Sequence, residues 1–385
     1  MQLKYGCNPH QTYAAVEPLT SGQMPVEILS GKPSLINFLD ALNAWQLVRE
    51  AGAALQLPAA ASFKHVSPAG AAVAVTLDAE LERVYEVQGK ELTPLATAYV
   101  RARGADPKSS FGDFVALSER VDVSTAEFLK GVVSDGIVAP DFEPAALDIL
   151  KAKKGGSFIV LRADAQFEPP ELEAREVFGM RLVQTRNNRA VTRDDLANVV
   201  CGELSEDARR DLLLGLIVLK YTQSNSVGYA LGGQMIGIGA GQQSRVDCTK
   251  LAGAKADVWH LGRHPKVLGL EFKRGVRRQE RINWRVRFIE GDLTRAEEES
   301  LRDALGGPLE LLGEAERRSW IEQLDGVSLV SDGFLPFRDN IDHAARHGVR
   351  YIAQPGGSSR DAEIQKTCRE YGISMVHTGL RLFHH

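Results

Sequence analysis

Short runs of apolar residues alternate along the chain with longer stretches in which apolar positions recur every three or four residues. The short runs are bounded by glycine or proline, which is typical of buried strands, and residues 58–63 are one example. The longer stretches are typical of amphipathic helices, such as residues 36–51 with Leu42 and Trp45 on one side. Gly52 follows the expected end of that helix. The alternation predicts an α/β fold.

The same alternation continues to the C-terminus. Helices are expected at residues 92–103, 124–130, 143–153, 207–221, 242–259 and 297–324, and from residue 338. Strands are expected at residues 115–117, 132–138, 158–161, 226–231, 234–238, 327–331, 349–353 and 373–377. The two strands that flank Gly232-Gly233 predict a hairpin. Residues 260–290 are basic and lack a period, so we expect them to be irregular.

Two features bear on domain organisation. Residues 162–190 are polar, contain Pro169-Pro170 and have few periodic apolar positions, which indicates a seam between two halves. The segment Val133-Ser-Asp-Gly-Ile137 is echoed by Val330-Ser-Asp-Gly-Phe334, each expected to run from strand to turn. A duplicated α/β unit explains the echo better than chance and predicts two similar halves that face each other.

Bulk composition limits the partners and the compartment. At about 150 residues per domain, 385 residues predict two or three domains. A net charge of −4 produces no overall electrostatic field that would attract the protein to nucleic acid or membrane. Local groups must therefore hold any anionic ligand. The chain has no run of about 18 apolar residues, and its four cysteines form no CxxC. We therefore expect a cytoplasmic protein without zinc, membrane or nucleic-acid partners.

Lys64 and His65 are the leading candidates for chemistry. They follow a predicted strand, and Pro68 and Gly70 are expected to end regular structure after them. A cation beside an imidazole at a strand end is a common way to present proton-transfer groups, and the lysine charge favours the neutral imidazole that acts as a base. Taken alone, such a pair is more often a surface lysine and a structural histidine. Two glycine-rich loops and two Ser-Asp-Gly turns, all expected at strand ends, favour the functional interpretation.

Three polar loops could bind ligand. The turn Gly237–Gly241 resembles a dinucleotide fingerprint, but Gln242 replaces its third glycine, so an anion site that includes Arg245 is favoured over a tight connection. The loop 355–361 could bind ligand, could cap a helix through Ser358 or Ser359, or could do both at once. The N-terminal segment 5–11 is either a solvated arm or a ligand-binding loop.

In combination, these stretches resemble the aminoimidazole carboxamide ribonucleotide (AICAR) transformylase domain of the bifunctional purine biosynthesis family. The resemblance covers essentially the whole chain and rests on residues 5–11, 62–70, 109–114, 133–137, 220–226, 237–245, 334–340, 355–358 and 380–385. The cyclohydrolase domain that precedes this region in the family is not in the sequence, so we expect a standalone transformylase.

The resemblance implies a fold of two tandem cytidine-deaminase-like α/β/α units, a duplication without the deaminase zinc site. The first unit is expected at residues 1–170, completed by about 263–321. The second is expected at residues 171–385, mainly 171–262 and 322–385. The resemblance also implies a homodimer whose active sites use both chains.

The implied reaction moves a formyl group from 10-formyltetrahydrofolate to the 5-amino group of AICAR. His65 is the implied proton-transfer group, and Lys64 is implied to stabilise developing charge or to protonate the leaving folate nitrogen. The implied AICAR contacts are Lys4, Tyr5, His65, Gly112, Asp135, Asn225, Arg245, Phe334 and Arg381. The implied folate contacts are Val246, Asp339, Asn340, Ser358, Ser359 and Phe111. The candidates for a potassium site are Val218, Ser224, Ser226, Asp332 and Leu382.

The sequence departs from the family at two of these positions. Lys4 replaces the usual arginine, which keeps the charge but removes the bidentate fork suited to phosphate. Ser359 replaces a frequent alanine, a small change if the backbone makes the contact. The alternatives are a 10-formyltetrahydrofolate hydrolase and a non-catalytic folate- or nucleotide-binding protein.

Overall fold

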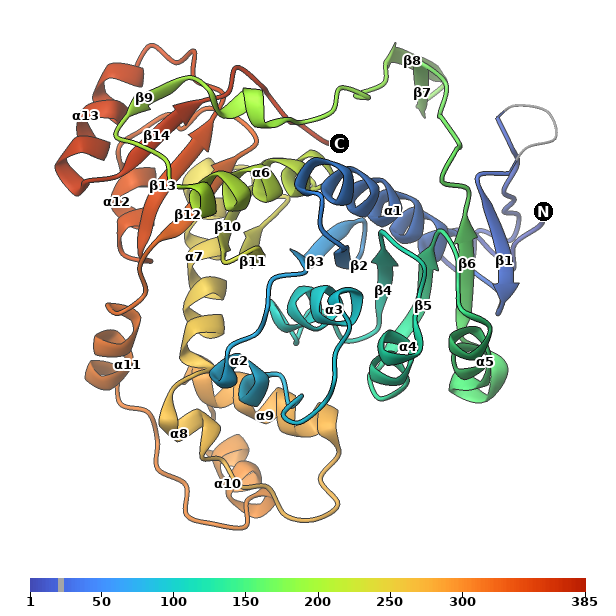
Figure 1. Cartoon of the computed structure of the whole chain (residues 1–385), viewed down its shortest axis with the longest axis horizontal. Coiled ribbons are helices and arrows are strands. Elements are labelled where there is room, and N and C mark those ends of the chain that lie inside the picture. The colour runs from blue at the N-terminus through green and yellow to red at the C-terminus, as the bar shows by residue number, and fades with distance from the viewer. Residues whose placement is uncertain (20–23) are drawn as a thin grey trace.

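A mixed sheet of twelve strands forms the middle layer of the computed structural model, which describes residues 1–19 and 24–385 (Figure 1). Its spatial order is β1 (Val26–Ser30), β6 (Ile159–Ala163), β5 (Ser134–Ala139), β4 (Asp113–Leu117), β2 (Ala59–Lys64), β3 (Ser67–Val73), β11 (Gln234–Gly239), β10 (Val227–Leu231), β12 (Val327–Ser331), β13 (Val349–Gln354), β14 (Ser374–His377) and β9 (Val199–Cys201). The predicted α/β class is confirmed.

The strand directions follow the same order in each half of the sheet. The hairpins β2–β3 and β10–β11 meet at the centre, where Ala72 pairs with Gln234. From each hairpin outward, one antiparallel pairing (β2–β4 and β10–β12) is followed by two parallel ones. An antiparallel edge strand, β1 or β9, then completes each half. In Figure 1 the first half lies on the right and the second on the left.

Helices cover both faces of this sheet and create two hydrophobic cores. One face carries α1 (Leu35–Leu55) and α6 (Glu206–Lys220), which contact each other. The other carries α3 (Pro94–Gly104), α4 (Val123–Lys130), α5 (Pro144–Ala152), α7 (Arg245–Leu261), α12 (Asp339–Ala345) and α13 (Asp361–Tyr371). Successive strand residues point to opposite faces, so Ala60 belongs to the core that contains Tyr99, whereas Ala61 belongs to the core that contains Leu216.

A smaller helical layer lies at the bottom of Figure 1 and has a core of its own. It contains α8 (Pro265–Leu268), α9 (Arg278–Glu290), α10 (Arg295–Ala304) and α11 (Glu314–Ile321), next to α2 (Ala79–Val84). The prediction of irregular structure over residues 260–290 was wrong, because α9 buries Val286, Phe288 and Ile289. The single helix predicted at residues 297–324 is interrupted between α10 and α11, where Gly306-Gly307-Pro308 occurs.

Other local predictions also need correction. Gly52 lies inside α1, which ends at Gln56 in a left-handed conformation. Pro68 and Gly70 lie inside β3 rather than ending regular structure. A side chain at Gly70 would meet the carbonyl oxygen of Ala102 at 2.2 Å, so this strand glycine permits close packing of α3.

The repeated Val-Ser-Asp-Gly segments occupy different places in the two halves. Ser134 begins β5, whereas Ser331 ends β12. In the order of strands, β5 corresponds to β13 and β12 corresponds to β4. The echo is therefore not a repeat of one structural position. The likeness of the halves lies in the strand directions.

The polar seam predicted at residues 162–190 contains a separate two-stranded ribbon. Its strands are β7 (Leu172–Val177) and β8 (Met180–Thr185), which project from the molecule at the top of Figure 1. Among the described residues, no helix is both long enough and apolar enough to span a membrane.

Candidate active site

The predicted pair Lys64 and His65 lies at the tip of the β2–β3 hairpin. Lys64 pairs with Ser67, which leaves His65 and Val66 as the two turn residues, with φ of 54° and 60°. Two residues with positive φ form a turn of the type I′ class, which usually contains asparagine and glycine. A β-branched valine in this conformation is strained, and such strain concentrates at functional sites.

Asp40 of α1 holds this turn from below. Its Oδ1 accepts a hydrogen bond from the backbone N–H of Val66 at 2.6 Å. Burial raises the pKa of Asp40, while the Val66 hydrogen bond and the neighbouring His65 oppose the rise. Asp40 is 5% exposed and His65 is exposed, so a buried carboxylate supports a turn that presents its imidazole to solvent.

Lys64 faces the loop that precedes β4. Its Nζ donates to the carbonyl oxygen of Phe111 at 2.5 Å. Gly112 has φ of 73°, and a side chain there would lie 4.0 Å from Lys64 Nζ and 3.9 Å from Asp135 Oδ2. The structure therefore brings together Lys64, Gly112 and Asp135, which the resemblance assigns to catalysis and AICAR binding, and Phe111, which it assigns to folate binding.

Lys154 belongs to this group and was not predicted. Its Nζ binds Asp135 Oδ1 at 2.9 Å, and its backbone is left-handed at φ of 53°. The neighbouring Lys153 donates to the carbonyl oxygen of Val132 at 2.6 Å, and burial and then the charge of Lys154 lower the pKa of Lys153 to about 8. The sequence signal was a pair of lysines before Gly155-Gly156 at a helix end, a place where such residues are usually solvated.

A buried ion pair fixes the strand ends beneath these groups. Asp113 Oδ1 accepts from Arg103 at 2.7 Å, and Asp113 Oδ2 accepts from Ser62 Oγ at 2.7 Å. Arg103 also donates to the carbonyl oxygen of Val133 at 2.9 Å. Burial raises the pKa of Asp113, and the Arg103 charge opposes the rise. The network joins β2, β4 and the start of β5, and so sets the positions of Lys64 and Asp135.

A second group of predicted residues surrounds Arg245 at the start of α7. Arg245 forms an ion pair with Asp332, donates to Asn225 Oδ1 at 2.7 Å and donates to the carbonyl oxygen of Ser226 at 3.2 Å. The side chain is 9% exposed. Protein partners thus occupy both terminal nitrogens of the guanidinium that we expected to bind an anion.

The glycine-rich turn has a structural explanation. Gly237 and Gly239 belong to β11, and side chains there would lie 2.1 Å and 2.3 Å from the carbonyl oxygens of Ala252 and Cys248 in α7. The helix begins at Arg245 rather than at residue 242. These glycines therefore let α7 pack closely on the sheet, and the helix starts later than the residue 242 that the sequence predicted.

The C-terminal tail covers this second group. Leu382 donates its backbone N–H to the carbonyl oxygen of Asp332 at 2.9 Å. The guanidinium of Arg381 lies 4.9 Å from the ring centre of Phe383, which also lies 6.0 Å from Arg245. The tail therefore brings Arg381 to the residues around Arg245.

Four of the five potassium candidates also gather here. Asp332 Oδ2 accepts from Ser224 Oγ at 2.7 Å and from the backbone N–H of Ser226 at 3.0 Å. Leu382 joins them through its backbone, and Ser226 Oγ is buried without a hydrogen-bond partner among the described residues. Val218 lies on α6, and its carbonyl oxygen accepts from Thr222 Oγ1 at 2.7 Å. Among the described residues, no cluster of three His, Cys, Asp or Glu side chains could hold a metal ion.

Apart from Phe111, which lies beside Lys64, the predicted folate residues lie at or just before the starts of α7, α12 and α13. Asn340 is 1% exposed, accepts from Thr249 Oγ1 at 3.2 Å and donates to Asp339 at 2.8 Å. Its side chain therefore holds α12 against α7, whereas Val246 and Asp339 are partly exposed.

The remaining predicted contacts are on more exposed parts of the same region. Ser358 accepts from the backbone N–H of Arg360 at 3.1 Å, and Ser359 is exposed. Neither serine caps α13, because the N-cap is Arg360, so that expectation was wrong. Phe334 is 47% exposed and free to meet a ligand.

Both groups lie along one edge of the sheet. β2 ends there beside the start of β4, β11 and the parallel strands β12 to β14 end there, and β10 begins there. The backbone N–H of Gln223 donates to Ser67 Oγ at 3.4 Å. Within one chain, the loop that carries Asn225 therefore touches the hairpin that carries His65.

The two N-terminal candidates are anchored separately. Leu3 is buried and its backbone N–H donates to the carbonyl oxygen of Ala14 at 2.8 Å. This pairing fixes the segment in which Lys4 Nζ lies 5.8 Å from the ring centre of Tyr5. The contact of Lys4 is thus with its neighbour Tyr5 rather than with the hairpin tip.

A family model described as AICARFT/IMPCHase bienzyme matches residues 1–255, well over half of the chain. The chain belongs to the AICARFT/IMPCHase bienzyme family. It is also 32% identical, over 390 aligned residues, to the bifunctional purine biosynthesis protein PurH of Persephonella marina. That alignment covers 100% of this chain and 59% of the relative, so the chain spans well under two thirds of the relative's length.

For a member of this family, the edge offers two kinds of chemistry. The hairpin tip presents an exposed imidazole and an ammonium 2.5 Å from a carbonyl oxygen, which together can transfer a proton and stabilise negative charge. The second group presents exposed aromatic side chains and Arg381, which suit a flat anionic ligand.

Proposed function

We propose that this chain transfers the formyl group of 10-formyltetrahydrofolate to the 5-amino group of AICAR, giving formyl-AICAR and tetrahydrofolate in purine biosynthesis. The observation that carries the proposal is the strained turn at His65, next to Lys64, Gly112 and Asp135, in a member of the AICARFT/IMPCHase family. The similarity to the bifunctional purine biosynthesis protein PurH of Persephonella marina supports the same assignment.

The chemistry requires the groups found at the hairpin tip. The AICAR amine is a poor nucleophile, because its lone pair is delocalised into the imidazole ring and toward the carboxamide. Attack on the formyl carbon needs removal of a proton and stabilisation of a tetrahedral oxyanion. In the proposed mechanism, His65 accepts the proton from the amine. Lys64 stabilises the oxyanion or protonates the folate nitrogen as it leaves.

In this proposal, the residues at the sheet edge form separate binding sites for the two substrates. The hairpin group holds the AICAR amine near Gly112 and Asp135, with Asn225, Phe334 and Arg381 around the nucleotide. The proposed AICAR set also keeps Lys4, Tyr5 and Arg245, although Arg245 is buried and acts through Asn225. Folate lies along Val246, Asp339, Asn340, Ser358, Ser359 and Phe111.

The fold of the proposed enzyme is a duplication of a cytidine-deaminase-like unit. The equal order of strand directions in the two halves supports it. The domain bounds expected from the sequence and a cytoplasmic location stay predictions.

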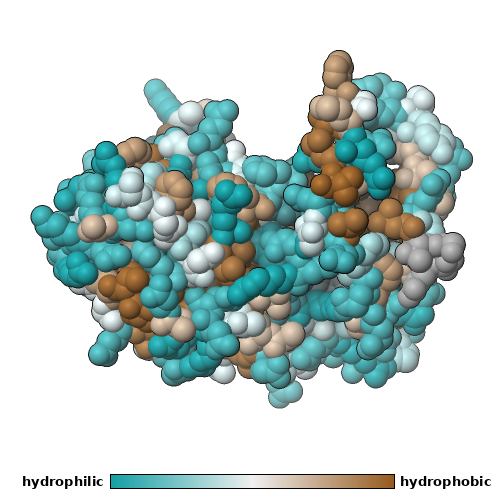
Figure 2. Space-filling model, turned by 90° about the horizontal axis from the view of Figure 1, so that it is seen from above, coloured by the Kyte–Doolittle hydropathy of each residue, from teal (hydrophilic) through white to brown (hydrophobic). Residues whose placement is uncertain are grey.

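The proposed active form is a homodimer with shared sites. The β7–β8 ribbon supports it, because two strands alone are marginally stable in water. Val177, Met180 and Leu182 on one face of the ribbon and Leu172 on the other are all exposed. Seen from above, hydrophobic side chains gather on a projection of the molecule (Figure 2). A second copy of the chain is the proposed partner of this ribbon.

The proposed potassium site is built from Ser224, Ser226, Asp332 and Leu382. Ser226 Oγ, which is buried and has no hydrogen-bond partner within residues 1–19 and 24–385, fits an oxygen ligand for a monovalent cation. When bound, the ion would supply a positive charge that orders the second group. No catalytic step depends on it.

The test is an assay of purified protein with AICAR and 10-formyltetrahydrofolate, followed by the absorbance of tetrahydrofolate. We expect turnover with both substrates and its loss in His65→Ala, with a melting temperature close to that of the wild type. A folded dimer that does not turn over would refute the proposal. Full activity in His65→Ala would remove His65 from its role.

A further inference from the structure

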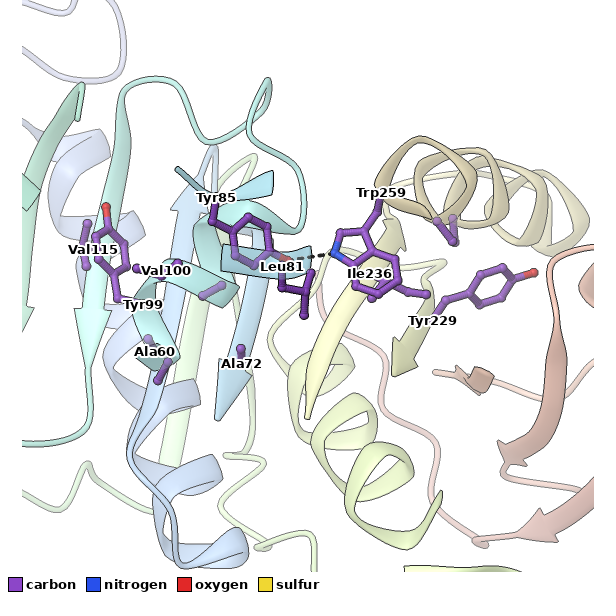
Figure 3. Packing of buried hydrophobic residues seen from close by; sticks show 14 of the residues in the cluster. Ala60, Ala72, Leu81, Tyr85, Tyr99, Val100, Val115, Tyr229, Ile236 and Trp259 are labelled. Carbon is purple, nitrogen blue, oxygen red and sulfur yellow. Dashed lines mark hydrogen bonds between the residues drawn. The ribbon is translucent and has the colours of Figure 1, made fainter. Parts of the chain in front are cut away.

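A pocket separate from the sheet edge lies between the α2–α3 region and helices α7 to α9. It encloses about 850 Å³, including the part open to solvent. Its apolar lining includes Val100, Phe128, Val258, Trp259, Val267 and Ile282. Figure 3 shows Tyr85 and Trp259 facing each other from the two sides, joined by a hydrogen bond of 3.0 Å. A mostly apolar pocket with a few polar groups is the usual form of a small-molecule site.

The charged groups of this pocket do not balance. Glu86 is the acidic lining residue, and it accepts hydrogen bonds from Arg278 at 3.3 Å, Arg281 at 3.0 Å and Arg285 at 2.5 Å. Arg103, the remaining charged lining residue, is neutralised by Asp113. Among the lining residues, one carboxylate therefore faces the two guanidinium groups of Arg278 and Arg285, an excess of one positive charge beside apolar walls.

The positive φ of Glu86 belongs to the left-handed cap that ends α2, with Val87 N–H bonded to the carbonyl oxygen of Glu82 at 2.9 Å. One detail indicates that the charge imbalance serves a ligand. The Nε–H of Arg285 is buried and has no hydrogen-bond partner among the described residues. A clamp that only fastened α9 to the first half of the chain would need one guanidinium for one carboxylate. Extra like charges in a desolvated place weaken such a clamp.

We propose that this pocket binds an organic anion with a flat apolar body, such as an aryl carboxylate. The carboxylate pairs with the surplus donors of Arg278 and Arg285, which suit bidentate recognition. The apolar body packs against Trp259, Phe128 and Val267. The inference is independent of formyl transfer, since it concerns a different cavity and is tested by binding alone.

Arg103 connects this pocket to the hairpin tip. Its guanidinium lines the pocket and also binds Asp113 and the carbonyl oxygen of Val133, next to Gly112. A ligand in the pocket would therefore lie one side chain away from the strand ends that support Lys64.

The probe is 2-naphthoate, titrated into the whole protein by isothermal calorimetry, with uncharged 2-naphthamide as the matched ligand control. We expect one site per chain for the anion and binding at least about tenfold weaker for the amide, because it cannot form charge-assisted hydrogen bonds. Equal affinity for the two, or no heat with the anion at millimolar concentration, would overturn the proposal.

Variants localise the binding. Arg285→Gln and Arg278→Gln should each weaken 2-naphthoate by about tenfold, and Ile282→Trp should abolish binding by filling the cavity. Arg287→Gln is the matched control, because Arg287 lies on the same helix but pairs with Asp292 and Glu297. If Arg285→Gln does not fold, Arg285→Lys, which keeps the charge, replaces it in the titration. Unchanged binding in folded Ile282→Trp would place the ligand elsewhere and refute the inference.

Discussion

At the residue scale, the proposed activity depends on how the hairpin tip is held in place. His65 and Val66 have left-handed backbones, and Asp40 provides the hydrogen bond that stabilises the turn from within the fold. Because Asp40 makes no proposed contact with substrate, it is a positioning residue. Its role can be separated from that of His65 by substitution.

Asp40→Ala should lower the turnover number for formyl transfer by roughly 10- to 100-fold. A buried hydrogen bond of about 1.5–3 kcal/mol is lost and the turn relaxes. Asp40→Asn keeps an oxygen for the Val66 N–H and should retain most of the activity. Steady-state kinetics of both variants, with melting curves, distinguish positioning from a general loss of stability. Equal activity in Asp40→Ala and wild type would contradict this role.

The ionisation of Glu86 predicts how the stability of the fold depends on pH. Burial alone would raise the pKa of Glu86, but hydrogen bonds and charges of Arg281 and Arg285 outweigh it and lower the pKa to about 2, from an ordinary 4.5. The folded state thus favours the charged form. Its contribution, on the order of 2–3 kcal/mol, is present above pH 4.5 and is lost as the pH falls toward 2.

The comparison is between wild type and Glu86→Gln. The wild type should have the larger free energy of unfolding at pH 6, and the difference should shrink steadily between pH 4.5 and pH 2. Urea denaturation at several pH values measures it. A difference that stays constant over this range would show that the arginines do not depress the Glu86 pKa.

Sequence reasoning found the reactive pair but not its support. Lys64 and His65 were visible because a cation and an imidazole follow an apolar run. Asp40 was hidden inside a helix pattern, 25 residues earlier in the chain, and Lys154 was indistinguishable from a solvated lysine. Arg245 was expected to bind an anion, and only the structure shows that Asp332 and Asn225 already engage its guanidinium.

At the element scale, close packing of helices on the central hairpins decides which glycines are required. β3 passes under α3 at Gly70, and β11 passes under α7 at Gly237 and Gly239. These contacts explain why glycine occurs in strand interiors, and why a glycine-rich sequence that resembles a ligand loop is part of the scaffold.

Gly70→Ala should destabilise the fold by about 1–3 kcal/mol, because its methyl group would overlap the carbonyl oxygen of Ala102. Gly307→Ala is the control, since a side chain there meets nothing within 4 Å. Thermal unfolding of both variants tests the packing. Similar melting temperatures for the two would argue against close approach of α3.

Most strands of the sheet and most helices that pack on it could be predicted. Their apolar residues recur with a regular period, and glycine or proline lies at their ends. The predictions failed where contacts between residues distant in sequence determine the local structure. Helix α9 is rich in arginine and shows no clear apolar period, yet Glu86 and a small apolar core hold it in place. Pro68 predicts an end of regular structure, but the β2–β3 pairing has an irregularity there that accommodates it.

At the scale of the whole molecule, the two halves are joined through the β3–β11 contact and present their candidate residues along one edge. The duplicated pattern of strand directions could not be obtained from the Val-Ser-Asp-Gly echo, whose two copies occupy different positions. The ribbon of β7 and β8 was hidden in a segment that looked like a linker. Its apolar residues suit a partner outside the chain.

Phe178→Asp and Leu182→Asp should convert the proposed dimer into monomers and lower formyl transfer strongly. Phe178 is fully exposed at the tip of the ribbon. Leu311→Asp changes an exposed apolar side chain elsewhere and should leave both properties unchanged. Analytical ultracentrifugation and the two-substrate assay report the outcome. Dimers that persist in both ribbon variants would exclude the ribbon as the dimer contact.

The most direct test of the account follows the formyl carbon itself. 10-Formyltetrahydrofolate labelled with ¹³C in the formyl group is incubated with AICAR and the wild-type protein, and carbon NMR identifies the product that carries the label. The account predicts label on the 5-amino nitrogen of AICAR, dependent on His65 and absent without the nucleotide. Label in formate in the absence of AICAR would identify a hydrolase instead. Label that stays on the folate despite tight binding of both ligands would identify a binding protein, and either result would contradict the proposed function.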